Sequence, residues 1–182
     1  MNKEKQLFYF KLSTFFLLGV ILLGVLFSGR LKKTLCSQPK TANITANAKP
    51  LSQTTIDKSF DFLIKKGGKD NFSIKIDKAT IVKLVTNKGK PLMAKEGQAY
   101  LLLYLLIDNN LQSSLNLNSQ NYFRLLVDDK KYAPDLYNTG VQIAPISTKS
   151  DQLGFVVKED QKEFKLQVGE IDGKKEVIDI KF

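Results

Sequence analysis

The residues best suited to chemistry in this chain are few. It contains no histidine and one cysteine, Cys36, so the usual general base and the commonest metal ligands are scarce. Without histidine, a hydrolase would have to pair a serine with a lysine or use two carboxylates. Ser37 and Lys40 have the spacing of a Ser-x-x-Lys motif, but they lie in a segment without predicted strands or helices, and chance explains the match better. We therefore predict no catalytic residues and no enzyme activity.

Metal and cofactor sites are not predicted either. Asp70, Asp128 and Asp129 could offer oxygen ligands to calcium, but their spacing lacks the acid and glycine pattern of a calcium loop, and solvated turns explain them better. Gly67 and Gly68 indicate a turn, because no strand-to-helix context for a phosphate-binding loop follows them. We expect no cofactor, and the ligand-binding residues stay unassigned.

An apolar stretch near the N-terminus is a candidate membrane span. Residues 12–29 contain no charged residue. At about 1.5 Å per residue, a helix of this length approaches the roughly 30 Å hydrocarbon core of a bilayer. The segment also lacks the polar face of a soluble helix. We predict that residues 1–29 form an N-terminal segment with one transmembrane helix at about 12–29, so that the lipid bilayer is a partner of the chain.

A cleaved secretory signal is the alternative for this segment. Residues 15–27 have the length of a signal core, but a small-x-small cleavage site is missing, and Arg30, Lys32 and Lys33 resemble a stop-transfer flank. An uncleaved signal anchor is favoured. Its orientation stays open, because the basic residues on the two sides mildly favour a cytoplasmic C-terminus. A short N-terminus followed by one span and a soluble domain is instead typical of anchors that export the domain.

The stretch that follows is predicted to be a linker. Residues 28–58 contain no aromatic residue, two prolines and six basic residues against Asp57 alone. Such a composition cannot bury enough apolar surface to offset the entropy of ordering the chain. We predict a disordered linker at 30–58 and a folded domain at 59–182. Only the last few linker residues could instead belong to an edge strand of the domain.

The net charge of +10 raises the question of nucleic acid. Residues 1–58 hold nine basic and two acidic residues, whereas residues 59–182 hold 19 basic and 16 acidic ones. Most of the excess therefore lies beside the predicted span, where it would attract anionic lipid headgroups. In the domain, lysines are interleaved with acids and most aromatic residues occupy positions typical of a core. We expect no nucleic-acid partner.

The domain shows the period-two alternation of half-buried strands. Strands are predicted at 60–64, 72–76, 80–85, 122–127, 153–157, 164–168 and 178–182. Turn signals are found at 66–69, 87–89, 128–131 and 172–173. No comparable stretch has helical spacing with caps.

Residues 99–107 are exceptional, because they are apolar without alternation. The run is too short to cross a bilayer, and a central strand that is covered on both faces fits it better. Seven or eight short strands separated by turns predict an all-β domain built as a two-sheet sandwich.

The order of these segments resembles that of a known family. FSIKID at 72–77, a β-branched strand, a loop to Glu96-Gly97-Gln98 and AYLLLYLLIDNN at 99–110 are similar to a bacterial domain family of unknown function. That family has a telokin-like, immunoglobulin-like β-sandwich. A glycine precedes its long apolar strand, and an asparagine ends the strand where Asn109 or Asn110 stands here.

Later positions extend the resemblance over roughly residues 70–182. They are Phe123, Asp128 and Tyr132, which match an aromatic followed by an acid-turn-Tyr motif, and residues 154–157 and 178–182, which match the closing strands. The chain departs from the family pattern before the late strand, where residues 147–150 stand in place of the usual Pro-Gly. The resemblance implies an immunoglobulin-like sandwich in an exported or membrane-anchored surface protein, and its motifs are structural positions.

Together these patterns predict an all-β, immunoglobulin-like β-sandwich preceded by one N-terminal transmembrane helix and a flexible linker. We expect a single-pass protein of the cell membrane with its C-terminal domain outside. Its expected function is that of a non-enzymatic binding module with a protein partner at the cell surface. A structural subunit of a bacterial envelope or secretion assembly is the alternative, and a sandwich enzyme with a carboxylate site is a distant third.

Overall fold

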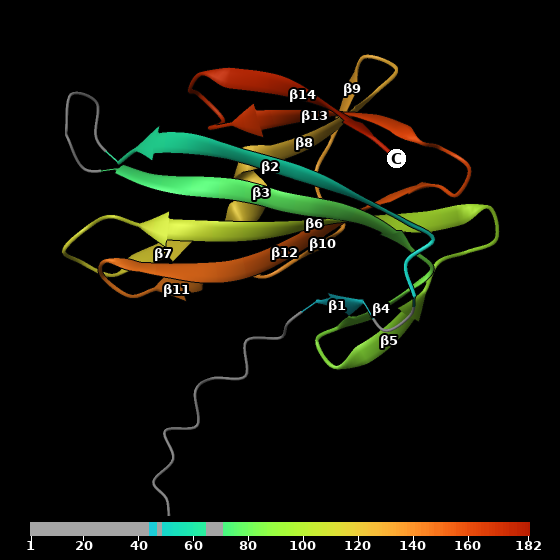
Figure 1. Cartoon of the computed structure of the whole chain (residues 1–182), viewed down its shortest axis with the longest axis horizontal. Helices are drawn as coiled ribbons and strands as arrows, with labels where there is room; N and C mark the ends of the chain where they lie inside the picture. The colour runs from blue at the N-terminus through green and yellow to red at the C-terminus, as the bar shows by residue number, and fades with distance from the viewer. Residues whose placement is uncertain (1–43, 47–48, 65–70) are drawn as a thin grey trace, which may run out of the picture. The chain divides into compact units, whose positions relative to one another are not determined.

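The computed structural model describes residues 44–46, 49–64 and 71–182 of the chain (Figure 1). They belong to one compact unit, Lys40–Phe182. Strands and one 3-10 helix, η1 (Ser119–Tyr122), make up its regular structure, and these described ranges contain no α-helix. The predicted all-β class is therefore confirmed for them. The predicted span at 12–29 and the predicted turn at 66–69 lie outside the described residues.

The strands form four hydrogen-bonded sheets. The five-stranded sheet has the order β10 (Leu136–Tyr137), β12 (Ser147–Lys158), β6 (Gln98–Asn109), β3 (Asn71–Val82) and β2 (Ser52–Leu63). The four-stranded sheet has the order β14 (Lys175–Lys181), β13 (Glu163–Gly169), β8 (Phe123–Val127) and β9 (Lys130–Tyr132). Two small sheets consist of β1 (Thr45–Ala46), β4 (Leu84–Asn87) and β5 (Lys90–Met93), and of β11 (Val141–Ile143) and β7 (Leu115–Leu117).

The five-stranded and four-stranded sheets pack face to face as a β-sandwich (Figure 1). Their inner faces contribute to one buried core, which includes Ile74, Leu103 and Phe155 from the first sheet and Phe123 and Leu166 from the second. All pairings are antiparallel, so each strand can bury one face and expose the other. This is the two-sheet sandwich that the alternation predicts.

Strand β6 lies in the middle of the five-stranded sheet, between β3 and β12. Residues 99–103 are buried on both faces, as predicted for the apolar run. The prediction of two dry faces is wrong for the second half of the strand, where Tyr104 and Leu106 are only half-buried. The reason is that the outer layer of the domain covers only the first half.

That outer layer is the β1–β4–β5 sheet. Its side chains Ile44 and Val85 form a second buried cluster with Val82, Tyr100 and Leu102 of the large sheet, which Leu136 completes. Half-buried Leu92 and Ala94 pack against the same cluster. The outer face of β6 is thus sealed by a small, separate core.

The folded domain begins earlier than residue 59. Residues 52–58, which we assign to the linker from the sequence, form the first half of β2, and β1 lies further upstream. The assignment fails because residues 52–58 belong to an edge strand. Such a strand has one sheet neighbour, here β3, and needs fewer apolar residues than an inner one. Half-buried Ile56, packed on the main core, is its apolar contribution.

The structure also differs from the two separate strands predicted at 72–76 and 80–85. Residues 71–82 form the single strand β3, which has a β-bulge between Ile76 and Lys78 where it pairs with β6. The extra residue changes the parity of the strand. Ile74 and Ile76 therefore face the same core as Ala79 and Ile81.

Two predicted hairpin turns are confirmed. The β4–β5 turn has positive φ at Lys88 (51°) and Gly89 (75°), and the β8–β9 turn has positive φ at Asp128 (46°) and Asp129 (62°). Positive φ at both central residues is the signature of a type I′ turn, whose twist matches that of the flanking strands.

Gly154 makes room for the second core cluster. It pairs with Leu102 of β6 and Leu136 of β10. A Cβ atom at Gly154 would lie 2.7 Å from Leu102 Cδ2 and 3.3 Å from Leu136 Cδ1. Leu102 is fully buried and cannot swing into solvent.

We predict that Gly154→Ala lowers the free energy of unfolding by about 1–3 kcal/mol, because the added methyl group overpacks a closed cluster. Chemical denaturation measures the loss. Lys158→Ala at the exposed end of the same strand is the control and should change stability by less than about 0.5 kcal/mol. If the clash is the cause, Gly154→Ala will cost less in a Leu102→Ala background. Equal costs in both backgrounds would contradict this explanation.

Candidate functional site

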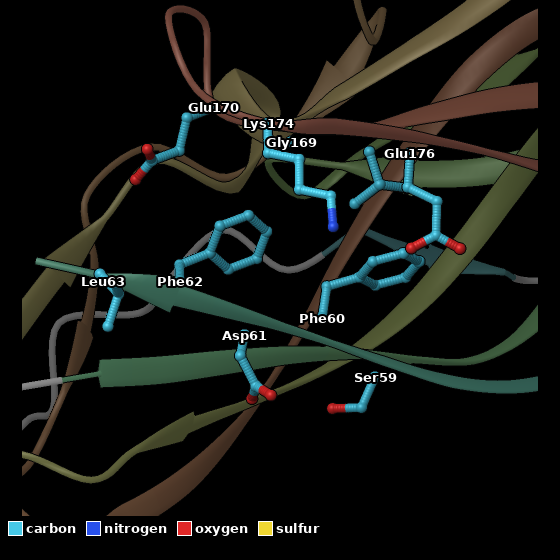
Figure 2. A pocket seen from close by; sticks show the side chains of 10 residues that line it. Ser59, Phe60, Asp61, Phe62, Leu63, Gly169, Glu170, Lys174 and Glu176 are labelled. Atoms are coloured by element: carbon cyan, nitrogen blue, oxygen red, sulfur yellow. The ribbon is translucent and has the colours of Figure 1, made fainter. Parts of the chain in front are cut away.

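A hollow of the domain lies at one open side of the sandwich, between β2 and the β13–β14 hairpin. It has a volume of about 420 Å³ and is lined by residues 59–63 of β2, Val168, Gly169, Glu170, Lys174 and Glu176 (Figure 2). Strand β2 ends the five-stranded sheet and β14 ends the four-stranded sheet, so the hollow lies where two sheet edges meet. We call this region the β2–β14 seam.

The floor of the hollow is aromatic. Phe60 and Phe62 point toward Glu170, Lys174 and Glu176, whereas Ser59 and Asp61 point to the other side of β2 (Figure 2). This follows from the alternation of a strand. Both phenylalanines are buried.

A cluster of three rings holds one end of this floor in place. The ring of Phe62 stacks on that of Phe72, with 5.3 Å between centroids, and the edge of Tyr122 packs against both at 4.7 Å and 5.8 Å. Rings packed in this way have little rotamer freedom. The floor is therefore a rigid apolar surface.

The rim of the hollow is charged. Lys58 of β2 forms an ion pair with Glu176 of β14, and its Nζ atom lies 5.5 Å from the centroid of the Phe60 ring. Glu170 and Lys174 form no ion pair within the described part of the chain. Figure 2 shows the Lys174 side chain reaching toward the space between the two phenylalanine rings. An apolar floor with both signs of charge at its rim suits binding of an amphipathic group.

The seam continues beyond the Lys58–Glu176 ion pair. A second hollow of about 550 Å³ is lined by residues 54–56 and Lys58 of β2 and by residues 177–181 of β14. Among the strands that the structure describes, neither β2 nor β14 has a second pairing partner on this side. The seam is therefore a groove bordered by two unpaired strand edges.

A β-bulge divides the edge of β2 within this groove. The register with β3 shifts between Thr55 and Lys58, where Asp57 adopts a positive φ of 50°. The Asp57 carboxylate accepts from Lys75 at 2.5 Å and, as hydrogen bond and as charge, raises the pKa of that lysine. Bulges of this kind interrupt the pairing of an edge with other strands. The regular stretch from Lys58 to Leu63 is the part of the edge that borders the aromatic floor.

A third hollow lies beside β8, β9 and β12. Its volume is about 340 Å³, and its lining includes Leu125, Tyr132, Phe155 and Val157. Its acidic residue is already engaged, because the Asp135 carboxylate accepts a hydrogen bond of 2.8 Å from the Val156 amide. The β2–β14 seam, with free charges at its rim, is the better candidate for recognition.

A buried polar cluster inside the sandwich is structural. The carboxylate of Asp151, which is 5% exposed, accepts hydrogen bonds from the Ser119 hydroxyl and, at 2.8 Å, from the Asn138 amide. These bonds tie η1 and the segment before β11 to β12. Ser119 is 1% exposed, and none of the three residues lines the hollows described above.

Of the residues weighed as chemical candidates in the sequence, the described part of the chain contains two, Asp128 and Asp129. These two residues form the β8–β9 turn. In residues 44–46, 49–64 and 71–182, no three His, Cys, Asp or Glu side chains are grouped so that they could hold a metal ion. Cys36, Ser37, Lys40, Gly67, Gly68 and Asp70 lie outside the described residues.

Asn109 has the place of the asparagine in the family resemblance, and its role is to hold two loops. It is 1% exposed, its amide donates to the carbonyls of Ser113 and Ala144 at 2.9 Å and 2.8 Å, and its side-chain oxygen accepts from the Leu111 amide at 3.1 Å. Asn110, the other candidate, is exposed. This position is structural, as the resemblance implies.

The seam residues could not be singled out from the sequence. Phe60 and Phe62 have the pattern of core residues, which they also are. Glu170, Lys174 and Glu176 are ordinary charges in and beside the turn predicted at 172–173. No sequence signal shows that this turn lies against β2, about 110 residues earlier in the chain.

Comparison with known proteins found no matching family model and no matching curated protein. Two solved structures are similar to the chain, each with a TM-score of 0.48. One is a conserved hypothetical protein from Bacillus anthracis, 15% identical, where the match covers 70% of this chain and 96% of that one. The other is an uncharacterized β-sandwich protein from Clostridium difficile 630, 19% identical, where it covers 73% of this chain and 100% of that one.

Tyr122, behind the aromatic floor, supplies a test of this geometry. Burial, and secondarily the charge of Glu170, raise the pKa of its phenol above the ordinary 10.0. A pKa that is higher in the folded than in the unfolded state stabilises the fold below pH 10, and this contribution is lost as pH rises above it. We predict that the free energy of unfolding falls less steeply above pH 10 in Tyr122→Phe than in the wild type.

The phenolate absorbance titration gives a second readout. Tyr122→Phe should remove a late-titrating component, and Glu170→Gln should shift that component to lower pH, since the negative charge beside the phenol is lost. A wild type and a Tyr122→Phe variant with the same alkaline slope would show that Tyr122 is not held in an apolar environment.

Proposed function

We propose that this chain is a membrane-anchored, surface-exposed protein whose sandwich domain binds an extended segment of a protein partner in the β2–β14 seam, without catalysis. The observation that supports the proposal is the seam itself, where an aromatic floor lies between two unpaired strand edges. An extended peptide can add to an exposed sheet edge through main-chain hydrogen bonds, while pockets take alternate side chains.

The parts of the seam suit this task in different ways. The edge of β2 from Lys58 to Leu63 offers main-chain donors and acceptors, and the hollow above Phe60 and Phe62 has room for an apolar side chain. Glu170 and Lys174 at the rim could pair with charges that flank this side chain. Aromatic anchors surrounded by a polar rim are typical of protein interfaces.

The finer fold and the membrane location belong to the same proposal. An immunoglobulin-like topology, with the telokin-like resemblance that implies it, agrees with an antiparallel sandwich of one five-stranded and one four-stranded sheet. The anchor is supported by the uncharged stretch at 12–29. None of the described segments forms a helix of the length and hydropathy that crossing a bilayer needs.

Two alternatives are separable from this proposal. A structural subunit of an envelope or secretion assembly would use the same seam for permanent assembly, and it would co-purify with stoichiometric partners in mild detergent, whereas a lone surface module would not. A carboxylate enzyme would use Glu170 and Glu176, which both line the hollow. Binding is favoured over catalysis because Glu176 is ion-paired with Lys58 and partly exposed, whereas a catalytic general acid is usually desolvated.

Filling the seam should abolish recognition. We predict that the full chain in detergent micelles enriches a consensus from a random peptide display library, and that Lys174→Trp, which places an indole over the hollow, weakens binding of the consensus peptide at least about tenfold. Lys162→Trp, an exposed lysine outside the hollows described above, is the matched control. Failure to enrich any peptide, or equal binding by Lys174→Trp, would refute binding in the seam.

Surface exposure has its own test. We predict that protease treatment of intact cells removes the C-terminal domain, as detected with an antibody against residues 175–182, while a cytoplasmic marker stays intact. Full protection of the domain, with cleavage only after lysis, would refute the outward orientation.

A further inference from the structure

The β4–β5 hairpin and the segment beside it carry a concentration of unpaired positive charge. The lysines concerned are Lys49, Lys88, Lys90 and Lys95, and Glu96 is the acid that accompanies them. All four lysines are exposed, and none forms an ion pair in the part of the chain that the structure describes. This differs from the rest of the domain, where lysines alternate with acids.

The same region exposes large apolar side chains. Met93 is 67% exposed and Leu51 is 50% exposed. The alternation of β5 explains Met93, because Leu92 and Ala94 point inward to the second core cluster and Met93 lies between them. Across the hairpin it pairs with Leu84, which is half-buried. We call the four lysines, Met93 and Leu51 the basic hairpin surface.

The chain enters the domain beside this surface. Thr45 pairs with Thr86, so Ile44 lies at the level of Asn87, next to the Lys88–Gly89 turn. Ile44 is 1% exposed and so fixes the entry point in the second core cluster. Any attachment through the N-terminal part of the chain therefore starts at the tip of the β4–β5 hairpin.

The tether between the predicted span and this entry point is short. Because the domain begins by residue 44, the predicted tether is residues 30–43, about half the length expected when the domain starts at 59. Chain statistics give such a tether a mean reach of roughly 20 Å, about two and a half Debye lengths at physiological salt. A basic surface held at this distance is within easy reach of the headgroups of the membrane.

We propose that the basic hairpin surface docks on anionic phospholipid headgroups, with Met93 and Leu51 entering the interfacial layer. Each lysine near an anionic surface strengthens binding by roughly fivefold, and exposed apolar side chains add to it. The inference rests on the proposed function for its anchor. Docking orients the domain, because the β13–β14 turn lies on the other side of it from the β4–β5 hairpin (Figure 1). A partner can then reach one end of the seam while the hairpin contacts the membrane.

The experiment uses the full chain with Cys36→Ser, so that one introduced cysteine can be labelled with a polarity-sensitive fluorophore. The label is placed by Met93→Cys in one sample and by Ile171→Cys in another, because Ile171 is similarly exposed, at 62%, and lies in the β13–β14 turn. Each protein is inserted into nanodiscs of phosphatidylcholine alone or of phosphatidylcholine with phosphatidylglycerol.

Docking predicts a blue-shifted emission at position 93 in the anionic nanodiscs only, reversed by salt, and no shift at position 171. Lys88→Gln with Lys90→Gln should lower the docked-to-free ratio by roughly 25-fold, from two lysines at about fivefold each. Lys130→Gln with Lys131→Gln removes the same charge from β9 of the four-stranded sheet, away from the β4–β5 hairpin, and should have little effect. Equal emission in both nanodiscs, or equal effects of the two double variants, would overturn the proposal.

Different results would refute the predicted anchor and the proposed docking surface. A chain that inserts into neutral nanodiscs but shows no lipid-dependent shift keeps its anchor and loses the docking surface. A chain that does not insert refutes the anchor. Docking is then measured by sedimentation with anionic vesicles. Loss of vesicle binding in the Lys88→Gln, Lys90→Gln variant supports the docking surface, and unchanged binding by this variant overturns it.

Discussion

Burial of β6 on both faces is the constraint on which the rest of the domain depends. A strand with residues such as Leu101, Leu102 and Leu103 in succession cannot leave either face in water. The four-stranded sheet covers the inner face, and the β1–β4–β5 sheet covers the first half of the outer one. Both coverings therefore have to fold for β6 to be stable, and Gly154 is the position that leaves room for Leu102 and Leu136 in the second core cluster.

The two coverings also decide what is left open. A sandwich of two twisted sheets is closed at its centre and open along its sides, where edge strands cannot pair across the gap. Here the edges of β2 and β14 have no partner strand within residues 44–46, 49–64 and 71–182, and charged side chains line the gap between them. The candidate binding site is thus a result of how the sandwich is closed.

Local sequence patterns were enough to predict the all-β class, the central strand and the turns at 87–89 and 128–131, because each depends on neighbours within a few residues. They were not enough at 72–85, where the bulge after Ile76 reverses the parity and makes one strand look like two. They also failed at 52–58, where the edge strand β2 needs little apolar surface. In both places the deciding partner is another strand, which local sequence does not show.

The same reason limits prediction of the site. Phe60 and Phe62 look like core in the sequence, and only the packing of the β13–β14 hairpin against β2 turns one side of them into the floor of a hollow. The family resemblance does not indicate the site, because the positions it matches, such as Asn109, hold loops together and do not line the hollow. Glu170, Lys174 and Glu176 form the rim of a hollow only because the β13–β14 hairpin packs against β2.

The pairing of β1 with β4 has a mechanical consequence. Only Thr45 and Ala46 pair with β4, and buried Ile44 is the main side chain that holds this end of the chain. Tension between an anchor upstream and a partner bound in the seam would act on this short contact before it reached β2, which pairs with β3 along most of its length. Under load β1 would open first, and because Ile44 would leave the second core cluster with it, the outer covering of β6 would loosen before the load reached the β2–β3 pairing.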